Sequence, residues 1–410
     1  MRVAFLTQDL QLSGGVGVIV NHAVQLARHG FDVDLVLTRS WDVPDWAHEG
    51  LATVQVVGLE EARERRYDVA LATWWETAYH LFEIDAARHV CFMQSLEDRF
   101  YSAGHPGQRA ATLAQDLPVR FITEARWIAA TLEALHVGER VLYVRNGIAK
   151  DVFAPVAAVP VAGGGPLRIL IEGSVDVPLK GVGDALAAVA TMRAPRHVTV
   201  VSGDGSGGRL DGVDRAVGPV GQRELASLYA EAHVLLKLSR VEGMFGPPLE
   251  GFHLGATCVV TPVTGHEEYV VHGENGLVVD WDDPAGTARA LDLLAHDRAL
   301  LHRLRCGAVA TARAWPSWEQ QGHVMAAALR AVRHQPPPDA RRAGRRLARD
   351  GAGAFSDAER LASELAVTRQ KAAEVQASRA YRLAVRGRTT IENILRAPGR
   401  WRRRRRGELV

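Results

Sequence analysis

Cysteine is scarce in this 410-residue chain, and the three copies, Cys91, Cys258 and Cys306, lie far apart. An odd number at such spacing fits neither a disulfide framework nor a zinc site, which indicates a reducing compartment. Long apolar runs are also missing, since no stretch approaches the roughly 18 uninterrupted apolar residues of a membrane-spanning helix. The first residues, MRVAFLT, lack the features of a signal peptide and read as a strand. We therefore expect a cytoplasmic protein without a membrane span.

Apolar residues make up 47% of the chain and charged residues 23%, which allows a sizeable core and excludes wholesale disorder. At this length two or three domains are expected. The net charge of +2 hides an asymmetry: from His334 to the end there are 19 Lys and Arg against 8 Asp and Glu, whereas the rest carries 30 against 39. A basic tail on an acidic body indicates attraction of the tail to something anionic.

The tail contains an expected helix at Asp357–Gln376 and ends in an arginine run, Gly399–Gly407 (GRWRRRRRG). An anionic membrane surface is the interpretation we favour, because each nearby basic residue contributes about 1 kcal/mol and Trp401 and Leu395 could insert at the interface. An arginine run alone supports nucleic-acid binding only weakly, so we expect no such partner. The remaining alternative is a solvated, disordered tail. The favoured interpretation places the protein at the inner face of the membrane.

The first 150 residues alternate short apolar runs with segments of helical period. The first helix is expected from about Val18 to His29, where Gly30 ends it. Such alternation is typical of a doubly wound parallel sheet. The expected strands are Val3–Leu6, Val33–Leu37, Val54–Gly58, Val69–Thr73, Val90–Met93, Phe121–Thr123 and Val141–Val144.

The stretch Pro155–Pro166 (PVAAVPVAGGGP) has no period and is rich in Pro and Gly, which predicts a linker. The alternation then restarts, so the expected fold class is α/β, with two Rossmann-like domains that face a cleft. We place these domains at residues 1–160 and 161–333, and a basic helical or disordered tail at 334–410. The second set of strands is expected at Leu167–Glu172, His197–Ser202, Arg215–Val217, Val234–Leu238, Cys258–Thr261 and Gly276–Val279, and its helices at about Val182–Met192, Gln222–Ala232, Pro248–Leu254 and Pro284–His296.

Two glycine-containing segments compete for a phosphate site. Gly203-x-Gly205-x-x-Gly208 has dinucleotide-binding spacing, but Arg209–Asp214, which follows it, reads as loop and strand. A pyrophosphate needs a helix N-terminus at that point, so we reject this site and expect no NAD there.

The stronger candidate is Ser239–Glu250 (SRVEGMFGPPLE), which follows a buried strand. It places Glu242 and Glu250 eight residues apart across a Gly-bounded loop, and Pro247-Pro248 mark the start of a helix. A loop that ends at a helix N-terminus presents backbone N–H groups and the helix dipole to an anion. On residue types alone, a ligand site and an ordinary surface junction are about equally supported.

This segment resembles the E-x7-E motif of the retaining glycosyltransferases of the GT-B fold, family four. Other motifs similar to that family's follow in the expected order over residues 1–333. They are the glycine pair Gly14-Gly15, Asn146-Gly147-Ile148 with Phe153 for "NGID..F", Lys180-Gly181, Gly265–Val270 (GHEEYV) for "GG..E", Asn275–Val278 (NGLV) for "NGLLV", and Trp315–Trp318 (WPSW) at the start of a last helix that crosses back over the first domain.

The resemblance implies a role for each matched residue. Glu250 would bind the ribose hydroxyls, and Glu242 with the following loop backbone would hold the donor sugar and the distal phosphate. Lys180 would neutralise the pyrophosphate, since a lysine and oriented amides stabilise a leaving diphosphate where its charge grows. Gly15 would bring the first domain's backbone close to the transferred sugar. The implied donor-binding residues are Gly14, Gly15, Ser174, Lys180, Arg240, Glu242, Gly243, Met244, Phe245, Gly246 and Glu250.

One position departs from the family pattern. Ser174 stands where the family has an arginine after the glycine, and that arginine shares the phosphate with the lysine. Arg240 or Arg145 would have to substitute, or the donor phosphate is held more weakly.

The first domain would bind the acceptor. Its segments Ala72–Tyr79 (ATWWETAY) and Cys91–Glu97 (CFMQSLE) resemble those of rhamnosyltransferase-like members of the family. Trp74 and Trp75 follow a strand, where aromatic faces could stack on sugars, with core packing as the alternative. The acceptor-side candidates are Trp74, Trp75, Gln94 and Glu97.

The resemblance implies transfer of a hexose, rhamnose among the candidates, with retention, from a nucleotide diphosphate sugar to a glycan or lipid-linked acceptor in cell-surface polysaccharide synthesis. The two glutamates would bind ligand rather than act as a glycosidase-like acid and base. We expect no cofactor and no metal, because the sequence has no aspartate-rich metal motif. Two alternatives stay open: a nucleotide-sugar epimerase of the same two-domain shape, and a non-catalytic scaffold that binds membranes through its tail.

Overall fold

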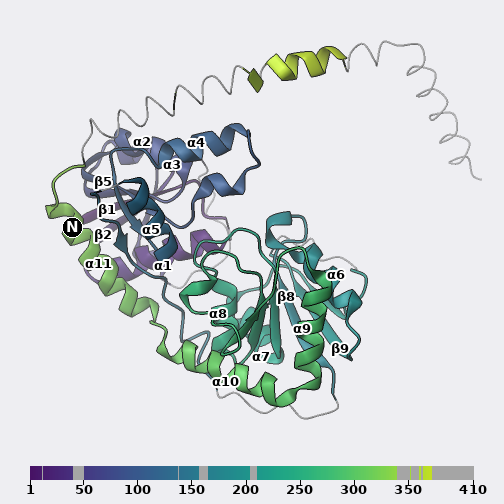
Figure 1. Ribbon diagram of the computed structural model, residues 1–410. Helices are drawn as coiled ribbons and strands as arrows, with labels where there is room; N and C mark the ends of the chain where they lie inside the picture. The colour runs from purple at the N-terminus through teal and green to yellow at the C-terminus, as the bar shows by residue number, and fades with distance from the viewer. Residues whose placement is uncertain are drawn as a thin grey trace, which may run out of the picture. The chain divides into compact units, whose positions relative to one another are not determined.

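The computed structural model describes residues 1–11, 13–39, 50–136, 138–156, 165–203, 210–338, 351, 360–361 and 363–371. Met1–Leu347 form one compact unit. This unit contains two parallel sheets with helices on both faces of each sheet (Figure 1). The α/β class and the two Rossmann-like domains predicted from the sequence are therefore confirmed.

The first sheet has seven parallel strands in the order β3-β2-β1-β4-β5-β6-β7. The chain winds outward from β1 in one direction and then from β4 in the other, so the topological switch point lies between β1 and β4. Every strand expected in this half is present. They are β1 (Arg2–Thr7), β2 (Asp32–Leu37), β3 (Gln55–Gly58), β4 (Arg66–Ala72), β5 (Asp85–Met93), β6 (Arg120–Thr123) and β7 (Leu142–Tyr143).

One face of this sheet is covered by α1 (Gly14–Arg28) and α11 (Trp318–His334), whose Leu26 and Leu329 pack with Phe5 in one core cluster. The opposite face is covered by short helices that the sequence-based prediction did not include. These are α2 (Leu59–Arg63), α3 (Trp75–Tyr79), α4 (Pro106–Ala114), α5 (Arg126–Leu135) and the 3-10 turns η2 (Leu81–Glu83) and η3 (Glu97–Phe100). A further 3-10 turn, η1 (Leu51–Thr53), packs on the side of α1.

The second sheet repeats the winding with six parallel strands, in the order β10-β9-β8-β11-β12-β13. All six strands and four helices expected here are present, and β8, β10 and α9 have the predicted bounds. The elements are β8 (Leu167–Glu172), η4 (Pro178–Lys180), α6 (Val182–Thr191), β9 (Arg196–Val201), β10 (Arg215–Val217), α7 (Gln222–Glu231), β11 (Val234–Lys237), α8 (Gly246–His253), β12 (Thr257–Val260), η5 (His266–Glu268), β13 (Gly276–Val278), α9 (Pro284–His296) and α10 (Arg298–Ala314).

The first helix starts earlier than the sequence pattern indicated. Ser13 is the N-cap of α1, and its Oγ accepts the Val16 N–H at 3.1 Å. Gly14 and Gly15 therefore lie in the first turn of the helix rather than in the preceding loop. The cap supplies an acceptor for a backbone donor that a helix N-terminus leaves unpaired, which explains why two glycines are tolerated there.

The last helix returns to the first sheet over a very close backbone crossing. A Cβ on Gly147 would lie 2.4 Å from the Trp318 nitrogen, and Ile148 forms an isolated parallel bridge with Ser317. Trp315 Nε1 donates to the Asn146 carbonyl at 2.9 Å. The two motifs quoted at 146–148 and 315–318 thus meet, although they are far apart in the sequence.

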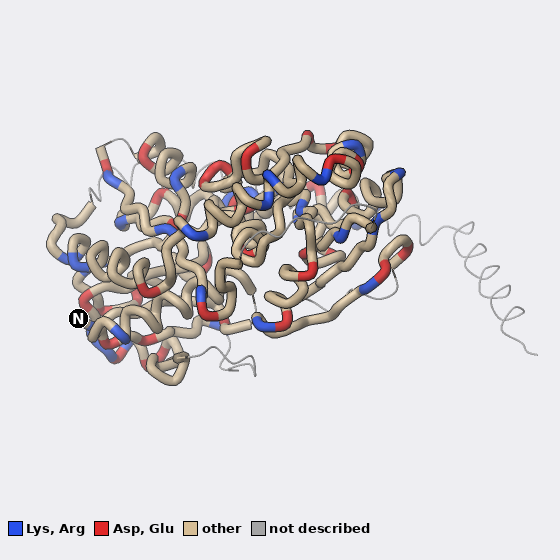
Figure 2. The backbone as a smooth tube through the Cα atoms, turned by 90° about the horizontal axis from the view of Figure 1, so that it is seen from below, with Lys and Arg blue, Asp and Glu red and all other residues tan. Residues whose placement is uncertain are grey.

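None of the helices in the described part of the chain combines the length and the apolar character needed to cross a bilayer. Basic and acidic positions are interspersed along the described backbone (Figure 2). Residues 360–361 and 363–371 are helical, within the helix expected at 357–376. The arginine run with Trp401 and Leu395 lies outside the described residues, as do residues 157–164 of the expected linker and Gly205 and Gly208 of the rejected fingerprint.

Candidate functional site

Lys180 and Glu242 meet at the switch point of the second sheet. Lys180 ends η4 after β8, and Glu242 lies in the loop after β11, which pairs directly with β8. Lys180 Nζ is 3.1 Å from Glu242 Oε1, and the Glu242 side chain is 12% exposed. The crevice outside the carboxyl ends of the strands at a switch point is where open α/β sheets bind ligands. The structure therefore joins the two charged groups at the predicted place.

The glycine after Lys180 is required by a backbone contact. Gly181 has φ +66°, and a Cβ at this position would lie 1.9 Å from the Leu238 carbonyl oxygen. The Arg240 N–H donates to the Leu179 carbonyl at 2.8 Å, so the turn that carries Lys180 lies directly against the loop after β11. Only glycine accepts both the left-handed conformation and the close approach, which gives the Lys-Gly pair a physical reason.

The loop after Glu242 leads into α8 through a strained residue. Phe245, the N-cap of α8, has φ 39° and ψ 63°, a left-handed conformation that a bulky residue rarely adopts. Burial holds it there, since Phe245 is 1% exposed and its carbonyl accepts a hydrogen bond from the Tyr269 hydroxyl. Pro247 and Pro248 have no N–H, so the amides available for an anion at this helix start come from the loop before them.

Glu250 lies one turn into α8 and is partly buried. Burial, together with the charge of Glu172, raises the pKa of the Glu250 carboxyl to about 7, although Tyr229 and Lys237 act in the opposite direction. At neutral pH a carboxyl group with this pKa is protonated in some molecules and ionised in the others. As a carboxylate it would accept two hydroxyl donors from one ligand.

Gly243 brings the two domains together. Trp127 Nε1, from α5 of the first domain, donates to the Gly243 carbonyl at 2.8 Å. A Cβ on Gly243 would lie 1.8 Å from the Gln94 carbonyl oxygen, and a Cβ on Gly265 would lie 2.1 Å from the Gly243 carbonyl oxygen. A side chain at either glycine would therefore displace backbone, so the loop between the two glutamates is held from both domains.

Gln94 connects that loop to the glycine pair. Its Nε2 donates to the Gly15 carbonyl at 3.0 Å, and its Oε1 would lie 3.0 Å from a Cβ on Gly15. Gly14 has open space around its Cβ position. Gln94 thus contacts both Gly15 and the position of Gly243.

The guanidinium groups of the two residues considered for the missing arginine have other partners. The Arg240 guanidinium pairs with Asp184 and Asp282, which satisfies its charge within its own domain. Arg145 stacks on Trp315, with its guanidinium carbon 4.3 Å from the ring centroid. Ser174 follows Gly173 in the loop after β8. The geometry therefore argues against Arg240 as a phosphate ligand, and it gives Arg145 a packing role.

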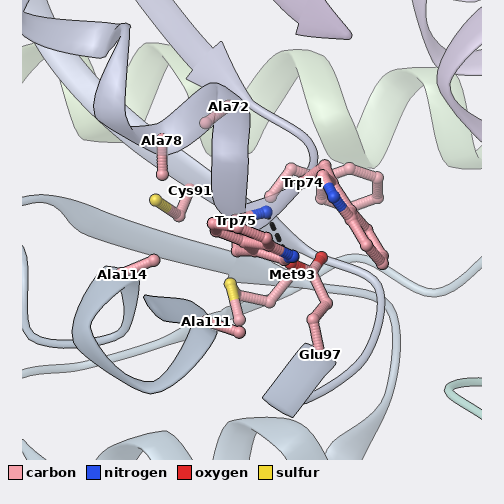
Figure 3. A pocket seen from close by; sticks show the side chains of 10 residues that line it. Ala72, Trp74, Trp75, Ala78, Cys91, Met93, Glu97, Ala111 and Ala114 are labelled. Atoms are coloured by element: carbon pink, nitrogen blue, oxygen red, sulfur yellow. Dashed lines mark hydrogen bonds between the residues drawn. The ribbon is translucent and has the colours of Figure 1, made fainter. Parts of the chain in front are cut away.

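The acceptor-side candidates form a second cluster at the carboxyl edge of the first sheet. Glu97 Oε2 accepts the Trp75 backbone N–H at 2.5 Å, and Trp75 Nε1 donates to the Tyr101 hydroxyl at 3.0 Å. The Trp74 ring stacks on Phe100 with 5.8 Å between centroids. Figure 3 shows Trp75 and Glu97 beside a small cavity that Met93 and Cys91 also line. Trp74 and Trp75 are half-buried and pack against neighbouring aromatic rings.

Glu97 lies in an environment that favours the protonated form of its carboxyl group. Burial raises its pKa well above the ordinary value, against the hydrogen bond from Trp75 and with a further contribution from Asp98. Glu97 is the acidic residue of a cavity lining that otherwise consists of aromatic and apolar side chains. Such a surface suits an uncharged polyol better than an anion.

A short chain of hydrogen bonds connects the two clusters. Arg99, in η3 next to Glu97, donates from Nη1 to Thr264 Oγ1 at 2.8 Å. Thr264 Oγ1 in turn donates to the Glu242 carbonyl at 3.2 Å. A change in the aromatic cluster can therefore reach the loop that carries Glu242.

Glu124 is a site residue that the sequence-based prediction did not include. It follows β6, is 5% exposed, and its Oε2 accepts Asn146 Nδ2 at 2.9 Å. Its Oε1 would lie 3.3 Å from a Cβ on Gly243. Burial raises its pKa to about 8, the bonds from Asn146 and the Met244 backbone oppose this, and Glu242 and Glu268 add to it. An acidic residue directly after an apolar strand was the available signal.

Glu172 and Lys237 were also missed, although each is a charged residue at the end of an apolar strand. Lys237 Nζ donates to the Glu172 carbonyl at 3.1 Å and to its Oε2 at 2.5 Å. Both therefore lie at the switch point, on the two strands that flank it.

Comparisons with known proteins agree with this geometry. Residues 166–297 match the family described as "Glycosyl transferases group 1". A D-inositol 3-phosphate glycosyltransferase of a Nocardioides species is 32% identical over 164 residues, which are 35% of this chain and 36% of that protein. The chain thus aligns with only about a third of this curated relative.

Solved structures extend the likeness to both domains. The sucrose-phosphate synthase of Thermosynechococcus elongatus has a TM-score of 0.67 and 17% identity, over 81% of this chain and 99% of that structure. HepE of Anabaena, solved with UDP and glucose, has a TM-score of 0.62 and 15% identity, over 81% and 100%. The protein therefore has the two-domain GT-B fold, and its second domain matches the glycosyl transferases of group 1.

Proposed function

We propose that the protein is a glycosyltransferase that takes a hexose from a nucleoside diphosphate sugar. The observation that carries the proposal is the contact between Lys180 and Glu242 at the switch point, in the loop that leads into α8 and Glu250. A lysine suits the diphosphate, and a carboxylate suits the ribose hydroxyls. UDP is the first nucleotide to test, because the structure of HepE contains it.

The finer proposals concern stereochemistry and acceptor. We propose retention of anomeric configuration without a protein base or a metal, since the E-x7-E arrangement resembles family four. Trp74, Trp75, Gln94 and Glu97 would form the acceptor side, where aromatic rings suit a glycan or lipid-linked glycan, rhamnose-containing polymers of the cell surface among them. The basic tail would hold the enzyme at an anionic membrane.

Titration calorimetry with UDP tests the donor site. We expect Glu250→Ala to weaken UDP binding by about 1.5–3 kcal/mol, because charge-assisted hydrogen bonds to the ribose are lost. Glu267→Ala is the matched control, since it removes an exposed carboxylate from η5 of the same domain. Equal affinities of wild type and Glu250→Ala for UDP, and for ADP, GDP and dTDP, would contradict the assignment.

The alternatives give different outcomes. An epimerase would release an epimerised nucleotide sugar and would need no acceptor. A scaffold that acts through its tail would lose its function on truncation after Pro338, whereas an enzyme would keep sugar transfer or donor hydrolysis. Sedimentation with anionic and neutral vesicles, with and without residues 339–410, tests the membrane proposal.

A further inference from the structure

The first turn of α5 has no cap from its own sequence. Its N-cap is Ala125, whose methyl group accepts no hydrogen bond, and the first turn, Arg126-Trp127-Ile128, contains no acidic residue. A helix N-terminus leaves up to four backbone N–H groups without an intrahelical partner, and alanine is among the poorest N-cap residues. An acceptor from another segment is therefore favoured at the start of α5.

The second domain supplies that acceptor. Glu268, the last residue of η5, accepts the Arg126 N–H with Oε1, although the two residues are 142 positions apart. Its Oε2 accepts the Tyr143 hydroxyl of β7 at 2.8 Å. The helix dipole also favours a carboxylate at a helix N-terminus. Both oxygens of this carboxylate thus bind donors of the first domain, and Glu268 caps α5 across the domain boundary.

The Tyr143 hydroxyl is itself held from the first domain. It accepts Arg145 Nε at 3.1 Å while it donates to Glu268. The Arg145 guanidinium lies over the Trp315 ring, and Trp315 bonds to the Asn146 carbonyl. The contact between the two domains therefore ends on a hydroxyl whose position is fixed by the crossing of the chain at residues 146–148 and 315–318.

The segment that carries Glu268 also contacts the donor loop. Gly265, which precedes η5, has φ +93°, and a Cβ there would lie 2.1 Å from the Gly243 carbonyl oxygen. Trp127 Nε1, in the first turn of α5, donates to the same oxygen at 2.8 Å. The first turn of α5 thus meets the second domain twice, through the Arg126 N–H at η5 and through the Trp127 ring at the donor loop.

The adjacent glutamate of η5 makes a different contact. The Glu267 side chain is 50% exposed and lies 3.0 Å from His266 Nδ1 of the same segment. An acidic residue in η5 does not by itself reach the first domain, so the cap depends on the position of Glu268. Glu267 is therefore its matched control.

We propose that Glu268 is a positioning residue for the transfer step: by capping α5 from the other domain, it holds the loop after Glu242 against the first domain when the donor is bound. The inference rests on the proposed function and adds to it a residue that acts on turnover rather than on nucleotide affinity. Lys180 and Glu250, which would bind the nucleotide, both belong to the second domain. The transferred sugar would lie where that domain meets Gly15 of the first.

Calorimetry with UDP and steady-state cleavage of UDP-glucose test the inference in Glu268→Ala and Glu267→Ala. In Glu268→Ala we expect UDP affinity to stay within about twofold of wild type and kcat to fall about 10-fold at unchanged KM, because a helix cap and a hydroxyl contact are lost. Glu267→Ala should keep the wild-type kcat. Hydrogen exchange of the first-turn amides of α5 should become faster in Glu268→Ala and stay unchanged in Glu267→Ala.

Tyr143→Phe tests whether the effect runs through this contact. It removes one of the two donors to Glu268 and should lower kcat about threefold. Residues that act through one contact are not additive, so the double variant Tyr143→Phe/Glu268→Ala should be no slower than Glu268→Ala alone.

The outcomes separate the inference from the proposed function. If the wild type binds none of UDP, ADP, GDP and dTDP, or cleaves none of the corresponding hexose donors, the proposed function fails and the positioning role with it. If the wild type binds and cleaves its donor but Glu268→Ala has the wild-type kcat, only the positioning role is overturned. The same holds if UDP affinity falls as much as kcat, or if the effects of Tyr143→Phe and Glu268→Ala multiply. Should Glu268→Ala fail to fold, Tyr143→Phe decides: a wild-type kcat in that variant would overturn the proposal.

Discussion

The two sheets share one winding order, yet their carboxyl edges carry different chemistry. In the second sheet, ion pairs flank the switch point, with Lys180 against Glu242 and Lys237 against Glu172. In the first sheet, the corresponding edge carries half-buried tryptophans and the buried acids Glu97 and Glu124. The fold supplies the crevice, and the side chains at the strand ends decide whether it suits a diphosphate or a neutral polyol.

The two sheet edges also differ in how well they should tolerate amino-acid substitutions. The second-sheet edge is built from backbone contacts that admit only glycine, as at Gly181 and Gly243. The first-sheet edge, apart from the Gln94 carbonyl, is formed mainly by side-chain contacts such as those of Trp75 with Glu97 and Tyr101. The predictions below test this contrast, in order of expected effect.

Gly181→Ala should lower the free energy of unfolding by about 2–4 kcal/mol, because its Cβ would meet the Leu238 carbonyl and its left-handed φ disfavours alanine. Urea denaturation measures the loss. Gly183→Ala is the matched control, since its Cβ would meet nothing within 4 Å inside α6, where alanine favours the helix. Similar losses in both variants would mean that the close contact does not matter.

Glu124→Gln should change how stability depends on pH. The pKa of Glu124 is raised to about 8 in the folded protein, so the native state binds more protons than the unfolded state between about pH 4.5 and 8. The stability it contributes is complete below the unfolded pKa and is lost as pH rises through about 8, with a slope of up to about 1.4 kcal/mol per pH unit.

Because glutamine does not titrate, Glu124→Gln should be more stable than wild type at pH 9 and lose this advantage at pH 5. Denaturation curves at several pH values measure the effect. Glu64→Gln, at an exposed position after α2, should follow the wild-type profile. A parallel shift at all pH values for Glu124→Gln would show that the residue does not titrate in this range.

Trp74→Ala should leave UDP affinity unchanged and lower transfer to glycan acceptors by about 5- to 30-fold, which corresponds to roughly 1–2 kcal/mol of aromatic contact. The readout is transfer to a panel of free and lipid-linked glycans, compared with hydrolysis of the donor. Phe82→Ala is the control, an exposed aromatic of the same domain in η2. A loss of UDP affinity in Trp74→Ala would place this residue on the donor side instead.

Thr264→Val should have the smallest effect, about 0.5–1.5 kcal/mol of stability, since it removes the hydroxyl between Arg99 and the Glu242 carbonyl. Thr191→Val, at a hydroxyl that bonds only within α6, serves as the comparison. If both cost the same in stability and neither alters UDP binding, the two edges are not coupled through this link.

The sequence alone determined the strands and the two-sheet architecture. Apolar runs of four to six residues with Gly or Pro between them have one dominant solution. The donor-side candidates Lys180, Glu242 and Glu250 were singled out by resemblance to a known family, because the residue types alone left a ligand site and a surface junction equally supported. The start of α1 at Gly14 was misplaced, since a Ser13 cap can extend a helix over glycines that propensity disfavours.

Only the tertiary structure decided which charges face one another. Arg240 was an equal candidate for the phosphate until its pairing with Asp184 and Asp282 was visible. Lys237 and Glu172 are 65 residues apart and become partners through the register of β8 and β11. Burial then sets the protonation of Glu250 and Glu124. Which strands pair, and how deeply a side chain is buried, depend on residues that are far apart in the sequence. The sequence pattern shows the residue types, but it does not show which distant residues come into contact.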